Sequence, residues 1–200
     1  MFLLTKPTKP TIQQFIIDSR NSELSYPEIN ATRGEERPVG YNIDHNRIRL
    51  GSGLGDFEKA KNAIAGWKMF DMKWVRLCHA DTPIEVGREV AIMVKHFGFY
   101  SLNAARIVYV MDNADNVHRF GFAYGTLAEH GEIGEERFSV EFHEETGEVW
   151  YDLYAFSRPA SLLARVGYPL SRYLQKSFVA DSKRAMFKAV SGVPVTQQNS

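Results

Sequence analysis

The segment Phe120–Pro159 constrains the fold of this chain most strongly. Its apolar and polar residues alternate with a period of two, which is typical of strands that keep one face in a core. Two turn-forming stretches that contain glycine, His130-Gly131 and Glu145-Thr146-Gly147, divide it into three strands. Because such short connections join antiparallel neighbours, the segment predicts the centre of an antiparallel sheet.

A helical region follows this sheet. Apolar residues recur at helical spacing from Leu162 to Val190, with Gly167 and Pro169 as interruptions. We therefore expect a short helix, a kink, and a long helix from about Pro169. Roughly twenty residues at ~1.5 Å each span ~30 Å, which is enough to cross a sheet.

The chain before Phe120 supplies the other elements. We expect a surface arm over Met1–Lys9, a helix from Pro10 to about Arg20, a wrapped loop over Asn21–Gly40, and a helix over Phe57–Phe70 with a break at Gly66. The period of two places strands near Arg47–Leu50, Lys73–His79, Gly87–Lys95, Asn103–Met111, Val117–Leu127, Ile133–Phe142 and Glu148–Ser157.

This order of elements predicts an α+β fold: a curved antiparallel sheet of about seven strands that grips a long C-terminal helix. The layout resembles the START-like, or helix-grip, fold. We expect one domain over 1–200, with an N-terminal helix and loop (1–40), a helix-grip core (41–190) and a flexible tail (191–200). A curled sheet closed by one helix leaves an apolar cavity between them, which is the usual form of a small-molecule site.

Several short segments are distinctive. They are Ala31-Thr32-Arg33-Gly34, Gly40-Tyr41, Leu50-Gly51-Ser52-Gly53, Phe57 with Ala60-Lys61 to Trp67, Phe120 to Leu127, Gly134-Glu135-Glu136-Arg137-Phe138 and Phe156-Ser157-Arg158-Pro159. In these segments the chain resembles the family called domain of unknown function 1990, over about residues 28–190. The resemblance implies kinship, but it supplies no reaction, cofactor or catalytic residue.

Charge and cysteine content narrow the function classes. The chain has 24 basic and 24 acidic residues, so it lacks the basic surplus of a dedicated nucleic-acid binder. Cys78 is its only cysteine, which favours a reducing, cytoplasmic location. No apolar run approaches the ~20 residues of a membrane-spanning helix. We expect no integral membrane segment and no nucleic-acid partner.

Two possible cofactor signals are weak. Gly51–Gly55 precedes a helix as a phosphate-binding turn does, but its spacing is GxGxG and Asp56 places negative charge where a phosphate would lie. The six histidines show no HxH or HExxH spacing. We therefore predict neither a cofactor nor a metal.

Alternation on Ile133–Phe142 places Glu136 and Phe138 on one face. If that face lines the cavity, Glu136 is either a polar anchor or a general acid/base, or it is half of a structural ion pair with Arg158 or Arg106. Tyr124 is a candidate hydrogen-bond donor to the same site.

The strand Glu148–Ser157 carries large side chains on both faces, so its pattern does not say which face is inside. Asp152 and Tyr154 are candidate pocket residues if their face is the inner one. On the following helix, Leu170 and Leu174 are the candidates.

Three functions of different classes fit this reading. The first is binding of a small hydrophobic molecule, such as a lipid, an isoprenoid or an aromatic compound. The second is an enzyme on the same fold, a cyclase, hydrolase or isomerase that uses Glu136 or Asp152 as its acid/base. The third is an interaction protein, with self-association through an aromatic patch or a basic helix face as one form.

Overall fold

The described strands form one antiparallel sheet. The structure, a computed structural model, describes residues 1–128, 130–160 and 168–192, except the side chains of 168–171. The sheet order is β2-β8-β7-β6-β5-β4-β3, and β1 pairs with β5. The strands are β1 Phe2–Leu3, β2 Asn42–Ser52, β3 Val75–Cys78, β4 Glu89–Lys95, β5 Tyr100–Ala114, β6 Val117–Thr126, β7 Glu132–His143 and β8 Glu148–Pro159.

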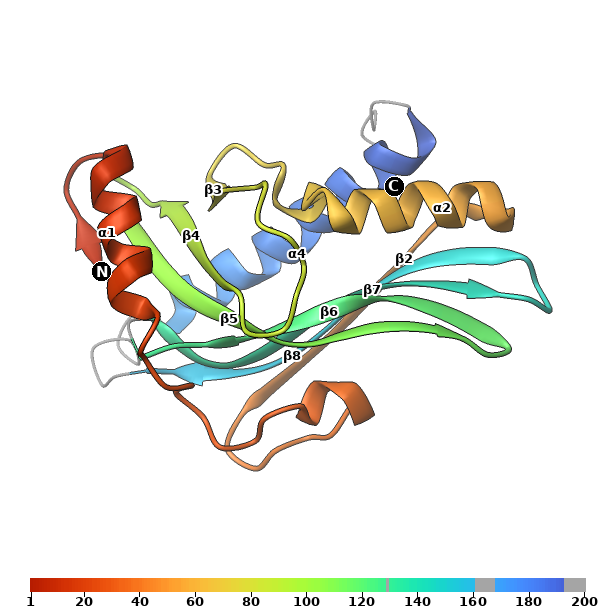
Figure 1. Ribbon diagram of the computed structural model, residues 1–200, viewed down its shortest axis with the longest axis horizontal. Coiled ribbons are helices and arrows are strands. Elements are labelled where there is room, and N and C mark those ends of the chain that lie inside the picture. The colour runs from red at the N-terminus through yellow and green to blue at the C-terminus, as the bar shows by residue number, and fades with distance from the viewer. Residues whose placement is uncertain (129, 161–167, 193–200) are drawn as a thin grey trace.

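Helices cover both faces of this curved sheet (Figure 1). They are α1 Lys9–Ser19, α2 Gly53–Ala65 and α4 Tyr168–Ser191, with the short 3₁₀ helices η1 Ala31–Gly34 and η2 Lys68–Phe70. The concave side holds α2, η2 and α4, whereas α1 and η1 lie on the outer side. The predicted antiparallel sheet that grips a long C-terminal helix is confirmed.

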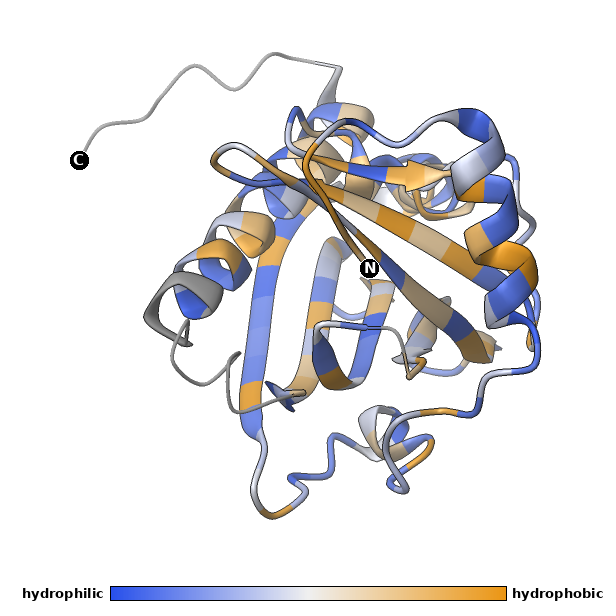
Figure 2. Ribbon diagram, turned by 90° about the vertical axis from the view of Figure 1, so that its left-hand side faces the viewer, coloured by the Kyte–Doolittle hydropathy of each residue, from blue (hydrophilic) through white to orange (hydrophobic). Residues whose placement is uncertain are grey.

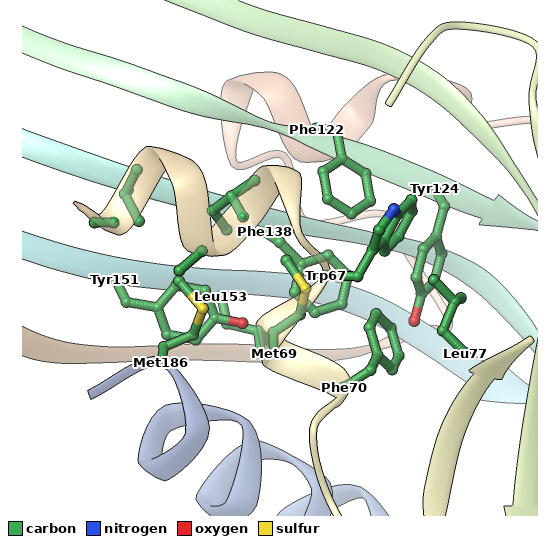
Figure 3. Packing of buried hydrophobic residues seen from close by; sticks show 14 of the residues in the cluster. Trp67, Met69, Phe70, Leu77, Phe122, Tyr124, Phe138, Tyr151, Leu153 and Met186 are labelled. Atoms are coloured by element: carbon green, nitrogen blue, oxygen red, sulfur yellow. The ribbon is translucent and has the colours of Figure 1, made fainter. Parts of the chain in front are cut away.

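Helix α4 is anchored on the concave side by its second half. Met186 is completely buried among residues of α2 and the sheet, and Val190 is nearly so. The Ser182 and Tyr151 hydroxyls lie 2.8 Å apart in a hydrogen bond between α4 and β8. Figure 3 shows Met186 beside Tyr151. These contacts fix the C-terminal half of the helix on the sheet.

Helix α2 begins at Gly53, four residues before the predicted start at Phe57. Gly53 has a φ of 77°, a conformation that favours glycine, and it turns the chain out of β2. Asp56 then accepts a hydrogen bond from the Ser52 backbone N–H at 3.1 Å. This carboxylate occupies the helix N-terminus, so the glycine-rich turn serves the fold. The predicted break at Gly66 is confirmed, because α2 ends at Ala65.

The N-terminal segment covers the outer face of the sheet. Phe15 of α1 packs with Leu102 and Ala104 of β5, and η1 lies against β7 and β8. The arm at the start of the chain forms the short strand β1, as Phe2 pairs with Ser101. Figure 2 shows both hydrophilic and hydrophobic residues along the strands of the sheet.

The structure resolves the ambiguity of β8. Tyr151 and Leu153 belong to the concave core, and Asp152 and Tyr154 therefore point to the outer face. Both faces are covered, which is why both carry large side chains.

Some expectations fall on residues outside the described ranges. The short helix expected before Pro169 and the tail after Gly192 belong to these. Among the helices that are described, none combines the length and apolar character that a membrane crossing requires.

Truncating Met186 tests the anchoring of α4. We expect Met186→Ala to lower the free energy of unfolding by about 2–5 kcal/mol, because a buried side chain is replaced by a cavity. Lys188→Ala, at an exposed position of the same helix, is the control and should change it by less than about 0.5 kcal/mol. Urea unfolding measures both. Equal effects of the two substitutions would contradict this packing.

Candidate functional site

A cavity of about 930 Å³ lies between the concave face of the sheet and α4. Residues of β2, β4, β5, β6, β7 and β8 line one side, and residues of η2 and α4 line the other. This volume lies within the usual range for sites that hold one small molecule.

Most of the cavity wall is apolar. Its main apolar side chains are Phe70, Trp74, Ile92, Val94, Phe178 and Val179. The Phe70 ring centre lies 5.6 Å from that of Phe178 and 6.4 Å from that of Tyr124. Figure 3 shows Phe70 beside Tyr124 at the margin of the aromatic cluster. Trp74 is held in place because its Nε1–H donates to Asp181 of α4 at 2.9 Å.

A tyrosine–carboxyl pair stands on this wall. Tyr124 of β6 and Glu136 of β7 are register partners in the sheet, so their side chains leave the same face side by side. The Tyr124 hydroxyl donates to Glu136 Oε2 at 2.7 Å. Both residues line the cavity, and Glu136 makes no ion pair with any described residue. Neither arginine considered from the sequence is its partner: Arg106 pairs with Glu89, and Arg158 lies over the Tyr41 ring.

This environment favours the neutral form of the carboxyl. Burial raises the pKa of Glu136 from 4.5 to about 8, and the nearby carboxylates of Glu132 and Asp44 raise it too. The hydrogen bond from Tyr124 acts in the opposite direction and is outweighed. Burial and the same carboxyl raise the pKa of Tyr124 well above its ordinary value. Near neutral pH the pair therefore carries two protons and no charge.

A second polar group lies where α4 meets the sheet. Arg172 of α4 holds Asp44 of β2 with two hydrogen bonds of 2.5 and 2.8 Å. The amide of Gln175 donates to Glu132 at 2.5 Å and to the Ser157 hydroxyl at 3.1 Å. These bonds tie the first half of α4 to β2, β7 and β8 at the edge of the cavity.

Two histidines line the cavity and are uncharged at neutral pH. Burial lowers the pKa of His130 to about 4, and it also lowers the pKa of His96. His130 Nδ1 lies 3.1 Å from the backbone of Glu132, and His96 Nε2 lies 2.9 Å from the Ser101 hydroxyl. Each ring therefore adds a fixed polar atom to the wall without adding charge.

The structure brings together three of the residues named from the sequence. Tyr124, Glu136 and Leu174 line the cavity. Phe138 lies behind the wall in the core, with its ring centre 5.3 Å from that of Tyr124. Leu170 belongs to α4, but its side chain is outside the described part of the chain.

Asp152 lies on the outer face of the sheet, away from the cavity. It accepts from Arg137 at 2.7 Å and contacts His45 at 2.7 Å and Arg47 at 3.0 Å. This carboxylate is fully engaged in an ion-pair network, which corrects its proposed role as a cavity acid/base. The physical reason is alternation: Leu153 faces the core, so Asp152 cannot.

Tyr154 and Arg158 are also outer-face residues. The Tyr154 hydroxyl donates to the backbone carbonyls of Glu35 and Glu36, each at 2.9 Å. The Arg158 guanidinium lies 4.6 Å from the centre of the Tyr41 ring. Both side chains fasten the loop before β2 to the sheet.

The outer network also contains a group with metal-ligand chemistry. One ligand atom from each of Glu35, His45 and Asp152 lies within 4.8 Å of the others. Arg137 donates to both carboxylates, and Arg47 adds a second guanidinium to Asp152. Because this positive charge already neutralises the carboxylates, we describe the group as an ion-pair network.

Sequence reasoning missed several cavity residues. Asp44, Gln175, His130 and Trp74 line the space, yet none was named as a site residue. Asp44 carried a usable signal, since it precedes the predicted strand Arg47–Leu50 at even spacing from Ile48. Gln175 carried no such signal, because a helical residue one position after Leu174 does not share its face. The partners of both are distant in sequence, so their pairing was not predictable.

Comparison with known proteins identifies the family. Residues 25–185 match the family described as "Domain of unknown function (DUF1990)". The chain belongs to this family. It is 38% identical to a UPF0548 protein of Dictyostelium discoideum, over 95% of this chain and 96% of that protein. It is 36% identical to a UPF0548 protein of Deinococcus radiodurans, over 94% of this chain and 98% of that protein.

The solved structures to which the chain is similar are distant in sequence. A hypothetical protein from Helicobacter pylori is 12% identical, with a TM-score of 0.48, over 86% of this chain and 96% of that chain. A point mutant of norcoclaurine synthase from Thalictrum flavum, in complex with a transition-state analogue, is 11% identical, with a TM-score of 0.45. The match covers 78% of this chain and 97% of that chain. Human STARD10 is 8% identical, with a TM-score of 0.44, over 92% of this chain and 81% of that chain.

The neutral carboxyl of this DUF1990 member predicts a pH-dependent stability. Folding raises the pKa of Glu136 from 4.5 to about 8, so the folded state binds the proton more tightly. The stability that this proton provides is complete below pH 4.5 and is lost as the pH rises toward 8. Relative to Glu136→Gln, wild type should lose about 1.4 kcal/mol per pH unit across that window.

Urea unfolding at several pH values measures this difference. Glu145→Gln, at an exposed turn position, is the control and should follow the wild-type profile at every pH. Parallel profiles for wild type and Glu136→Gln would mean that the carboxyl ionises normally in the folded protein.

Proposed function

We propose that this protein binds a small hydrophobic molecule, of the lipid, isoprenoid or aromatic class, in the cavity between the sheet and α4. The observation that carries the proposal is a space of about 930 Å³ with mostly apolar walls and a few fixed polar atoms. An apolar space of this size favours an apolar occupant, because burial of its surface there is favourable by ~25 cal/mol per Å².

The position of the polar groups supports the same function. The Glu136–Tyr124 pair and the Gln175 amide stand on opposite sides of the space, one on the sheet and one on α4. The Gln175 amide is engaged within the protein, so the Glu136 carboxyl is the group that orients a bound molecule, whereas the apolar wall provides most of the affinity. The described arginine at the cavity edge, Arg172, is already bonded to Asp44.

A second function is favoured by one observation, the carboxyl–tyrosine pair. A carboxyl with a pKa near 8 can donate and recover a proton near neutral pH, which is the property of a general acid/base. An enzyme of the cyclase, hydrolase or isomerase type would use Glu136 in this role, with Tyr124 to orient it. Mass spectrometry of a bound ligand, incubated with wild type or Glu136→Gln, would detect turnover that depends on the carboxyl.

Two further parts of the proposal concern the cellular location of the protein and its self-association. We propose a cytoplasmic location, because the single cysteine is a buried free thiol and no intrachain disulfide can form. Self-association stays a prediction that sedimentation tests. An exposed aromatic side chain on α4, Tyr173, is one candidate contact for it.

Filling the cavity tests the binding function. Ala155 lines the space from β8, so Ala155→Phe places a ring in it. A ligand at about 100 times its Kd adds about 2.7 kcal/mol of stability, which raises the Tm of a chain of this size by roughly 5–10 °C. We expect this shift for wild type in a screen of lipids, isoprenoids and aromatic compounds, and its loss for Ala155→Phe.

Ala114→Phe, at the exposed end of β5, is the matched control and should keep the shift. Native mass spectrometry of the purified protein provides a second readout. The absence of any shift in all three compound classes, together with no co-purified molecule, would contradict the proposal.

A further inference from the structure

One oxygen of the cavity carboxyl is left without a partner. Tyr124 donates to Glu136 Oε2, whereas Oε1 makes no hydrogen bond with any residue in the described part of the chain. Glu136 lines the cavity, and the side chain is only partly accessible. A bound molecule that covers this atom has to supply the missing hydrogen bond, because a polar atom that is buried without a partner is costly.

The charged groups around Glu136 come from every element packed against it. Asp44 on β2 and Glu132 on β7 are acidic, and both disfavour a second negative charge. Arg172 on α4 is basic, but it binds Asp44 with both of its terminal nitrogens. Within the described part of the chain, the Glu136 carboxyl therefore lies next to negative charge and has no cation of its own.

The two neighbouring hydroxyl groups add no charge. Tyr124 on β6 and Tyr151 on β8 both have pKa values well above the ordinary value, because both are buried. The Tyr151 hydroxyl is engaged with Ser182. Glu136 therefore stays protonated, and since Oε2 is the acceptor of the Tyr124 bond, the free O–H belongs to Oε1 and faces the cavity.

We propose that the cavity selects an uncharged molecule whose apolar body carries a hydrogen-bond-accepting oxygen, such as a ketone, aldehyde or ester carbonyl, which accepts from Glu136 Oε1. This inference rests on the proposed binding function and specifies its ligand. The carbonyl supplies the bond that the protein leaves open.

Charged ligands fit this site less well. A carboxylate would lie next to Glu132 and Asp44 and meet like charge. A protonated amine would lose its hydration in an apolar space, and the carboxylates that could balance its charge, Asp44 and Glu132, already accept hydrogen bonds from Arg172 and Gln175. A molecule with no polar group at all would leave the Oε1 hydroxyl unsatisfied.

Four probes with one naphthalene body separate these cases. They are 2-acetylnaphthalene with a carbonyl, 2-ethylnaphthalene with no polar atom, 2-naphthoate and 2-naphthylmethylammonium. Fluorescence titration at about pH 6, where the carboxyl is protonated, should rank 2-acetylnaphthalene first, about tenfold tighter than 2-ethylnaphthalene. Both charged probes should bind more weakly than 2-ethylnaphthalene.

The pH and two variants identify the group responsible. As the pH rises through about 8, the preference of wild type for 2-acetylnaphthalene should disappear, because the donor is lost. Glu136→Gln keeps an acceptor for Tyr124 and an N–H donor for the ligand, so it should keep the preference at every pH. Glu136→Met has no donor and should bind the acetyl and ethyl probes equally. Circular dichroism checks that each variant is folded.

The outcomes distinguish this inference from the binding function on which it rests. If 2-ethylnaphthalene or a charged probe binds wild type as tightly as 2-acetylnaphthalene, the selection for a carbonyl is wrong and the apolar cavity function survives. If no probe binds and the compound screen gives no shift, the binding function fails and the inference fails with it.

Discussion

Alternation of side chains along β7 and β8 is the constraint on which the rest of the structure depends. On β7 it sends Glu136, Phe138 and Val140 to the concave side and Glu135 and Arg137 to the outer side. Both sides are then buried, so the polar residues of the outer side need partners from elsewhere in the chain. The N-terminal segment supplies them.

Glu135 shows how closely this outer side is satisfied. It accepts hydrogen bonds from the Tyr26 hydroxyl at 2.7 Å, from the Asn30 backbone at 2.8 Å and from the Thr32 backbone at 3.0 Å. Arg137 donates to the Thr32 carbonyl at 2.9 Å. Glu136, one residue between them, accepts one bond from Tyr124 and faces the cavity. Adjacent carboxyl groups therefore differ: Glu135 is saturated by the fold, and Glu136 is left open to a ligand.

Two segments that carry the family resemblance meet at this place. Ala31–Gly34 forms η1, and the segment 134–138 forms part of β7. A hydrogen bond from the Thr32 backbone N–H to the Glu135 carboxylate joins the two segments. These two segments therefore form contacts that hold the N-terminal loop on the sheet. Glu136 is the member of the segment whose side chain pairs with Tyr124 on the cavity wall.

The sequence predicted the element order, the curved antiparallel sheet and the helix that it grips, because periods of two and of 3.6 are local signals. The same signals placed Tyr124, Glu136 and Leu174 on the cavity wall. They could not place Asp152 and Tyr154, because the outer cover of β8 comes from residues more than 100 positions away. Long-range pairs such as Arg172 with Asp44 leave no periodic pattern to read.

The charge state of Glu136 is the property that joins the fold to the proposed function, and it can be measured directly. Carbon-13 NMR of glutamate labelled at the side-chain carboxyl, with Glu136→Gln to assign the resonance, follows the titration of this one group. We predict a midpoint near pH 8, because the carboxyl is buried beside two other carboxylates and pairs with no cation among the described residues. A midpoint at or below the ordinary value of 4.5 would show an ionised carboxylate and would contradict a neutral donor in the cavity.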